Sequence, residues 1–188
     1  MKLLLDTCVL YPTVMREMLL GAAKLGHFTP LWSERILGEW ERAAAKIGPE
    51  GPVQAKAEIA LLRAVWPRAE VALKPGVTSR LWLPDANDIH VLSSAISGHA
   101  DGIVTVNIKD FPRNLLAEEG LERLGPDQLL YELWLKDRDG LAAVGAKVLA
   151  EADRLSGQTW EMRALLKKAR LPRIAKALGS SGSSKAAG

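Results

Sequence analysis

The sequence has little of the residue types that form disulfides or bind zinc. Its 188 residues include one cysteine, Cys8, and only three histidines. A single cysteine cannot form an internal disulfide, and the cysteine partners of a structural zinc site are missing. Long apolar runs are missing too, because no eighteen apolar residues run together and the apolar start MKLLL ends at Asp6. We therefore predict a cytoplasmic protein that neither spans a membrane nor is secreted.

The overall composition is that of a folded protein. Apolar residues make up 48% and charged residues 25% of the chain, close to the averages for globular proteins. This composition excludes disorder and a fibrous repeat for most of the length. A chain of 188 residues fits one domain, or one domain with an appendage, and is too short for two full domains.

Positive charge is concentrated in the C-terminal third. Residues 1–128 hold 14 Lys and Arg against 16 Asp and Glu, net −2, whereas residues 129–188 hold 11 against 6, net +5. Such a surface suits a polyanion or an acidic partner protein, although a solvated helix face has the same pattern. The basic residues that we single out here are Arg163, Lys167, Lys168, Arg170 and Arg173.

Strand and helix patterns alternate along residues 1–128, which favours an α/β fold with a central parallel sheet. We expect strands at 2–5, 70–73, 102–106 and 121–124, and helices at 14–25, 32–47, 53–65 and 87–97. Only helical patterns follow Pro126. The predicted organisation is a domain at 1–128, a helical extension at 129–178 and a flexible tail at 179–188.

Acidic residues collect where the ligand site of a parallel sheet forms, beyond the carboxyl ends of its strands. Asp6 ends the first predicted strand, and Asn107 and Asp110 follow the strand at 102–106. Asp88 and Glu39 each stand at the border of an apolar helix face. Carboxylates that converge repel one another, so such a cluster makes physical sense chiefly around a cation. Oxygen ligands select Mg²⁺ or Mn²⁺, ions that accelerate phosphodiester cleavage.

Each of these residues also has a simpler interpretation. Helix capping explains Asp85 well and Asp88 in part, because acids are favoured in the first turn of a helix. A solvated helix position explains Glu39, for which Glu34 and Glu41 are competing candidates. His90 is interpreted as a packing residue or a supporting neighbour of the site, and Cys8 as a small buried residue. The six tryptophans are interpreted as core residues and hydrophobic anchors rather than a base-stacking platform.

Four segments together resemble the motifs of a PIN domain, in order and spacing. They are Leu3-Leu4-Leu5-Asp6-Thr7, Ser33-Glu-Arg-Ile36-Leu37-Gly-Glu39, Asp88-Ile-His-Val91-Leu92-Ser-Ser-Ala95 and Thr105-Val-Asn107-Ile-Lys-Asp110-Phe111. Within that family the chain is most similar to the VapC-type toxin ribonucleases of bacterial toxin-antitoxin systems. The similarity is strongest to the larger members, which carry a helical C-terminal region.

The resemblance implies a three-layer α/β/α sandwich and a Mg²⁺- or Mn²⁺-dependent endoribonuclease. Asp6, Glu39 and Asp88 match the first three acids of the family pattern. Asn107 stands where many relatives have Asp, so Asp110 is a candidate for the missing charge. The expected metal ligands are Asp6, Glu39, Asp88 and Asp110. Thr7 and Thr105 match hydroxyl residues that support the site.

The resemblance also implies partners. Such toxins cut structured RNA, either tRNA or an rRNA loop, are held inactive by a cognate antitoxin and commonly form dimers. The basic residues between Arg163 and Arg173 are expected to contact the RNA backbone or an acidic face of the antitoxin.

Other functions share parts of this pattern. One is a PIN nuclease of RNA processing that is not a toxin, and another is a non-catalytic PIN-like RNA-binding module, which Asn107 leaves open. A phosphatase of the haloacid-dehalogenase type also places Asp at a strand end beside Mg²⁺. It needs a second acid two residues on, where this chain has Cys8. A receiver domain needs an acidic pair and a lysine that are not evident.

Overall fold

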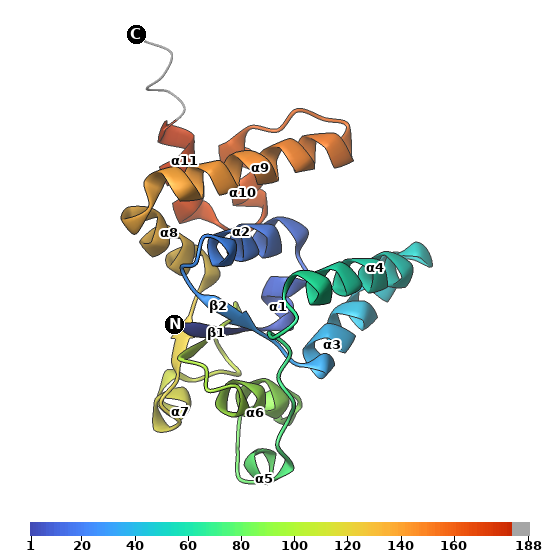
Figure 1. The fold of residues 1–188 in the computed structure, drawn as a ribbon, viewed down its shortest axis with the longest axis vertical. Coiled ribbons are helices and arrows are strands. Elements are labelled where there is room, and N and C mark those ends of the chain that lie inside the picture. Colours follow the sequence, from blue (N-terminus) through green and yellow to red (C-terminus); the bar gives the residue numbers. More distant parts are fainter. Residues whose placement is uncertain (182–188) are drawn as a thin grey trace. The chain divides into compact units, whose positions relative to one another are not determined.

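The computed structural model describes residues 1–181, which fold into two compact units (Figure 1). The first unit contains Met1–Tyr11 and Phe28–Leu124. The second contains Pro12–His27 and the chain from Gly125 onward. Because each unit is made of two separate stretches, the chain leaves the first unit after Tyr11, returns at Phe28 and leaves it again at Leu124.

A four-stranded parallel sheet forms the centre of the first unit. Its strands are β1 (Lys2–Leu5), β2 (Thr29–Leu31), β3 (Gly102–Val104) and β4 (Glu122–Leu124), in the order β2-β1-β3-β4. Leu4 of β1 pairs with Leu31 on one side and with Ile103 on the other. The three leucines of β1 are fully buried, as expected for a central strand covered on both faces. The predicted α/β fold with a parallel sheet is confirmed.

Helices and turns connect the strands of this unit. Ser33 caps the helix that follows β2, since its side chain accepts a hydrogen bond from the Ile36 N–H. The helix α6 packs on β1 and β3, and Figure 1 shows α6 and α7 below the sheet. The helical elements are α1 (Thr7–Leu10), α3 (Glu34–Ala44), η1 (Ala45–Ile47), α4 (Glu50–Val65), α5 (Pro75–Thr78), η2 (Ala86–Asp88), α6 (Ile89–Ser97) and α7 (Arg113–Glu118).

Two strands differ from the sequence prediction. The segment 70–73 forms no strand of its own and contributes a single parallel bridge between Trp32 and Glu70. The strand predicted at 102–106 ends at Val104, and Thr105 bonds through its backbone N–H to the carbonyl of Leu124. The sheet instead recruits β2, whose three residues are too few to show an alternating pattern in the sequence.

The second unit is entirely helical. Its α2 (Thr13–Lys24) packs against α8 (Pro126–Lys136) and α9 (Arg138–Ser156), and α11 (Pro172–Ser181) packs against α8 and α10 (Met162–Lys168). Small residues allow this close approach, because a Cβ at Gly21 would collide with Val144 and one at Gly145 with Leu178. The sequence predicts α2 as part of the domain at 1–128, but its contacts group it with the C-terminal helices.

The last helix extends into the predicted tail. Residues 179–181 belong to α11, so the prediction of a flexible tail is wrong for these three residues. The rest of the predicted tail, 182–188, lies outside the described residues. Within residues 1–181, no helix combines the length and the apolar character needed to cross a membrane.

Candidate functional site

The carboxylate of Asp6 is held where β1 ends. Asp6 is 6% exposed, and its Oδ2 accepts a 2.6 Å hydrogen bond from the hydroxyl of Thr105, the residue that follows β3. The Cys8 thiol donates to the same oxygen at 3.0 Å. Because both donors form hydrogen bonds with Oδ2, the other carboxylate oxygen of Asp6 remains available for a different partner.

Cys8 and Thr105 also fix the chain that leads to Asn107. The Val106 N–H donates to the Cys8 sulfur at 3.3 Å, and the Asn107 N–H donates to the Thr105 hydroxyl at 3.0 Å. Burial, the charge of Asp6 and the hydrogen bond to Asp6 together raise the pKa of the Cys8 thiol to about 12. The thiol therefore stays protonated at neutral pH and can donate a hydrogen bond. The ends of β1 and β3 are thus tied by side chains as well as by the sheet.

Glu39 on α3 lies among donors and cations. Its Oε2 accepts a 2.9 Å hydrogen bond from the Thr7 hydroxyl, and its Oε1 is 2.8 Å from Nε2 of the buried His90. Arg35, one helical turn earlier, approaches Oε1 at 3.6 Å. Burial acts to raise the pKa of Glu39, but the contacts with His90 and Thr7 and the charge of Arg35 outweigh it and lower this pKa below its ordinary value.

A second group of acids has the opposite environment. Carboxylate oxygens of Asp85, Asp88 and Asp110 lie within 4.8 Å of one another. Burial and then the charges of Asp6, Asp85 and Asp110 raise the pKa of Asp88 to about 6. In the described part of the chain, none of the three forms an ion pair with lysine or arginine. We call Asp85, Asp88 and Asp110 the acidic cluster.

Local structure explains how the cluster forms. Asp85 caps the 3₁₀ turn η2 by accepting a 2.8 Å hydrogen bond from the Asn87 N–H, and Asp88 ends that turn where α6 begins. The Asn107 side-chain amide donates to Oδ2 of Asp88 at 3.2 Å. The loop that carries Asp110 is held by Arg123, whose guanidinium donates to the carbonyls of Ile108 and Phe111.

The acidic cluster fits a divalent cation. All of its ligand atoms are carboxylate oxygens, and burial, followed by repulsion from Asp6, Asp85 and Asp110, raises the pKa of Asp88. A hard cation such as Mg²⁺ or Mn²⁺ prefers such ligands and would remove the repulsion. The Asn107 side-chain carbonyl is a further oxygen donor at the same place, because its amide nitrogen already bonds Asp88.

The structure brings together the five acidic or amide residues that the sequence singled out, in two groups. Asp88, Asn107 and Asp110 belong to the cluster or contact it, Asp6 is close enough to raise the pKa of Asp88, and Glu39 lies with Thr7 and His90. The sequence favours a helix-cap role for Asp85. In the structure Asp85 is both a cap and a cluster member. Its spacing of three residues from Asp88 at the start of a helix was the sequence feature that could have predicted this second role.

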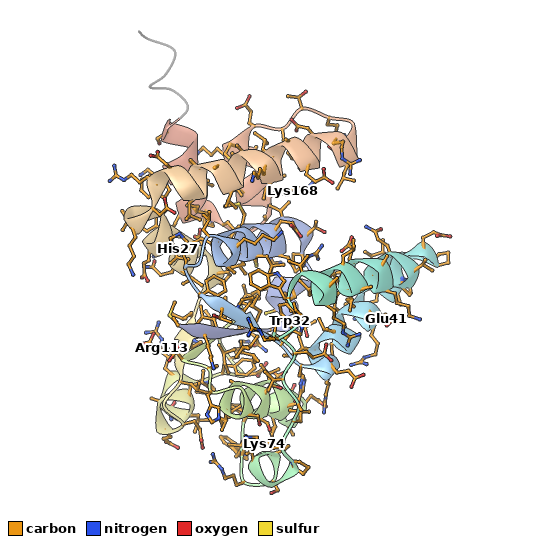
Figure 2. All side chains as sticks on the ribbon, in the orientation of Figure 1. His27, Trp32, Glu41, Lys74, Arg113 and Lys168 are labelled. Atoms are coloured by element: carbon orange, nitrogen blue, oxygen red, sulfur yellow. The ribbon has the colours of Figure 1, made fainter. Side chains whose placement is uncertain are left out.

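One of the two competing acids on α3, Glu41, points elsewhere. Glu41 pairs with Lys56 of α4 at 3.3 Å, and Figure 2 shows its side chain between α3 and α4. Trp32, labelled in the same view at the sheet, is fully buried, in agreement with the core role expected for tryptophan. Glu39 is therefore the α3 acid that contacts the Thr7 and His90 side chains.

The predicted basic residues belong to the second unit. Arg163, Lys167 and Lys168 lie on α10, with Lys168 stacked over the Trp160 ring at 4.7 Å from its centroid. Figure 2 labels Lys168. Arg170 has a left-handed backbone, φ 61°, in the turn before α11. The Arg173 side chain donates to Gln128, and its backbone N–H donates to the Asp127 carboxylate. All five side chains are exposed.

Comparison with known proteins gives one positive result. A family model described as PIN domain matches residues 2–109, more than half of the chain, and this segment includes Asp6, Glu39, Asp88 and Asn107. Searches among curated proteins and among solved structures found no match. PIN domains are usually metal-dependent nucleases, and the oxygen-rich cluster beside the parallel sheet agrees with that chemistry. The parallel sheet, the acids at its carboxyl edge and the matched segment together show that this chain belongs to the PIN domain family.

Proposed function

We propose that this protein is a metal-dependent endoribonuclease and the toxin of a type II toxin-antitoxin system, which cleaves tRNA or an rRNA loop. The observation that carries the nuclease part is the acidic cluster, in which three carboxylates lie within 4.8 Å of one another without a cationic partner among the described residues. The toxin part rests on the resemblance of the motifs and of the helical C-terminal region to VapC-type proteins.

In this proposal Asp88 and Asp110 bind Mg²⁺ or Mn²⁺, together with Asp85. When bound, the ion activates water and neutralises charge on the phosphate. Thr105 and Cys8 bind Oδ2 of Asp6, and the other carboxylate oxygen of Asp6 is proposed as a further ligand. Asn107 orients Asp88 through its amide group. Glu39, whose pKa is lowered, is charged at neutral pH and is proposed as a further carboxylate ligand from α3.

The proposed binding of RNA or of an antitoxin rests on the charge of the protein surface. An acidic site repels the RNA backbone unless a cation is bound, so positive charge elsewhere on the protein must hold the rest of the RNA. The exposed residues Arg163, Lys167, Lys168, Arg170 and Arg173 are proposed to do this, or to bind an acidic face of the antitoxin. A homodimer is a further expectation from the resemblance.

The first test is transcriptome-wide mapping of new RNA 5′ ends after a short induction of the protein. The variants are the wild type, Asp88→Asn, and Asp139→Asn as a matched control at an exposed position on α9. We expect new ends at one or a few tRNA or rRNA positions with the wild type and with Asp139→Asn, and none with Asp88→Asn. If the wild type is expressed and folded but produces no new ends, the endoribonuclease proposal is wrong.

Growth separates a toxin from a processing enzyme. We expect induction to arrest growth and co-expression of the neighbouring gene to restore it. New RNA ends without growth arrest would instead support a nuclease of RNA processing. Mn²⁺ binding by the purified protein, measured by electron paramagnetic resonance, excludes the metal-free binding module if it is present in the wild type and lost in Asp88→Asn.

The basic residues have their own test. Reversing the charge of Lys167, Lys168 and Arg170 removes three cations from the proposed RNA surface, which lowers RNA affinity and the steepness of its salt dependence, by about 0.7 in slope for each lost phosphate contact with single-stranded RNA. Unchanged RNA binding, salt dependence and antitoxin affinity would show that this surface has no such role.

A further inference from the structure

One tryptophan, Trp82, is largely exposed to solvent. Trp82 is 67% exposed, whereas Trp32 and Trp40 are 0% and 2% exposed. The core role predicted for the tryptophans is therefore wrong for Trp82. A large aromatic side chain that is exposed to solvent either has no binding role or is covered by a partner.

The segment around Trp82 is firmly anchored. Two residues before it, the Arg80 guanidinium forms paired hydrogen bonds of 2.6 and 2.7 Å with the Glu119 carboxylate. The next residue, Leu83, is 2% exposed. Upstream, the Thr78 and Ser93 hydroxyls are 2.6 Å apart and join α5 to α6. Because its neighbours on both sides are fixed, the exposure of Trp82 is a defined feature of the fold and not the result of a frayed loop.

Trp82 lies close to the acidic cluster along the chain. Asp85 is three residues away, which limits the separation of their Cα atoms to roughly 11 Å. The segment that carries Asp110 also exposes apolar side chains, with Ile108 64% and Val106 36% exposed. Each of the two segments that build the cluster therefore presents an exposed apolar residue within three positions of a cluster acid.

We propose that Trp82 is a stacking platform for an unpaired nucleobase of the RNA, next to the phosphate that is cleaved, with Ile108 as a second apolar contact. This inference rests on the proposed nuclease function and assigns to Trp82 the binding of a base beside the cleaved phosphate. Bases stack on exposed aromatic rings in a way that tolerates any sequence, because every base has a π face. In double-stranded RNA the bases are stacked on each other and are not available.

The size of the apolar surface favours a base over a protein. Trp82, Val106 and Ile108 together expose a few hundred Å² at most, whereas a stable protein interface buries roughly 1,000 Å² or more. One indole ring matches the area of a single nucleobase. A cation bound by the neighbouring acids would hold the adjoining phosphate, so that the base and the phosphate of one nucleotide would each have a partner.

The test measures binding apart from cleavage. The probe is a fluorescein-labelled oligoribonucleotide of twelve adenosines, with Ca²⁺ in place of Mg²⁺, and anisotropy reports its affinity. We expect Trp82→Ala to weaken binding about tenfold and Trp82→Phe to retain most of it, because phenylalanine can still stack. The control is Leu61→Ala, which removes a side chain that is 68% exposed on α4 and should leave binding unchanged.

An abasic oligoribonucleotide of the same length identifies stacking. The wild type should bind it about tenfold more weakly than the adenosine probe, and Trp82→Ala should cause no further loss. Equal loss on both probes, or failure of the wild type to bind the adenosine probe, would overturn the stacking role. Unchanged RNA binding by Trp82→Ala, with loss of rescue by the neighbouring gene, would assign the tryptophan to a protein partner instead.

The 5′-end map separates this inference from the proposed function. If the wild type produces no new ends, the nuclease proposal fails. If the wild type produces them and Trp82→Ala produces the same ends at the same rate, the nuclease proposal stands and the stacking role fails.

Discussion

Two groups of acids in the first unit differ in how their charge is balanced. Glu39 lies beside His90, Thr7 and Arg35, and its pKa is lowered. Asp88 lies among Asp6, Asp85 and Asp110, and its pKa is raised to about 6. The protein therefore stabilises the charge of Glu39 with its own side chains, whereas no lysine or arginine among the described residues pairs with the acidic cluster. The charge of Glu39 contributes to stability, and the charge of Asp88 costs stability, as expected for a functional site.

The largest expected effect is on the cluster. Asp88→Asn removes a carboxylate from the proposed metal site, so RNA cleavage should fall by roughly 100-fold or more and Mn²⁺ affinity should fall with it. Cleavage of the mapped RNA and Mn²⁺ titration check this. Asp139→Asn, exposed on α9, should behave as the wild type in both measurements. Full Mn²⁺ affinity in Asp88→Asn would remove Asp88 from the metal site.

The second effect is on stability and concerns Glu39. Glu39→Ala leaves the buried His90 without its acidic neighbour, so the free energy of unfolding should fall by about 2 kcal/mol in urea titrations with EDTA present. The matched variant Glu41→Ala loses only an exposed pair with Lys56, worth about 0.5 kcal/mol. Equal losses in the two variants would contradict the contrast between these acids.

The pH dependence gives the sign of the Glu39 contribution. Because the pKa of Glu39 is lowered in the folded protein, its stabilising effect is complete above the pKa of an unfolded glutamate, 4.5, and is lost as pH falls through the folded value. The stability difference between wild type and Glu39→Ala should therefore shrink below pH 4.5. A difference that grows in acid would be inconsistent with a lowered pKa.

A third, smaller effect concerns Cys8, which positions Asp6. Cys8→Ala removes the donor to Asp6 and the acceptor for the Val106 N–H, and we expect Mn²⁺ affinity to fall about tenfold. Cys8→Ser restores a donor and an acceptor and should recover most of the affinity. If both variants lose the same affinity, the thiol acts through packing and not through its hydrogen bonds.

The smallest effect is a gain in stability. The pKa of Asp88 in the folded protein, about 6, lies above its ordinary value of 3.8. Ionisation of Asp88 therefore lowers the free energy of unfolding; this loss grows from about pH 4 to pH 6 and stays constant at higher pH. In EDTA at pH 8, Asp88→Asn should be more stable than the wild type by about 1 kcal/mol, after allowance for solvent screening of this half-buried group. Below pH 4 the gain should vanish, and Asp139→Asn should show none.

Much of the first unit was predictable because its signals are local. The buried run of β1 stops at Asp6, Ser33 caps α3, and Asp88 begins α6, each at the position expected from the sequence. The strand at 70–73 was wrong, and β2 was missed, because three-residue pairings depend on neighbours distant in the chain. The grouping of α2 with the C-terminal helices was missed for the same reason.

The sequence by itself determined the family pattern: a parallel sheet, acids at the ends of its strands and a basic helical C-terminal region. These features follow from apolar periodicity, caps and residue spacing, which act within a few residues. Only the tertiary structure decided which acids share a site, that Asp85 joins Asp88 and Asp110, that Cys8 and Thr105 bond Asp6, and that Trp82 is left in water. The reason is that charge balance and burial depend on side chains up to a hundred residues apart, which meet only when the sheet forms.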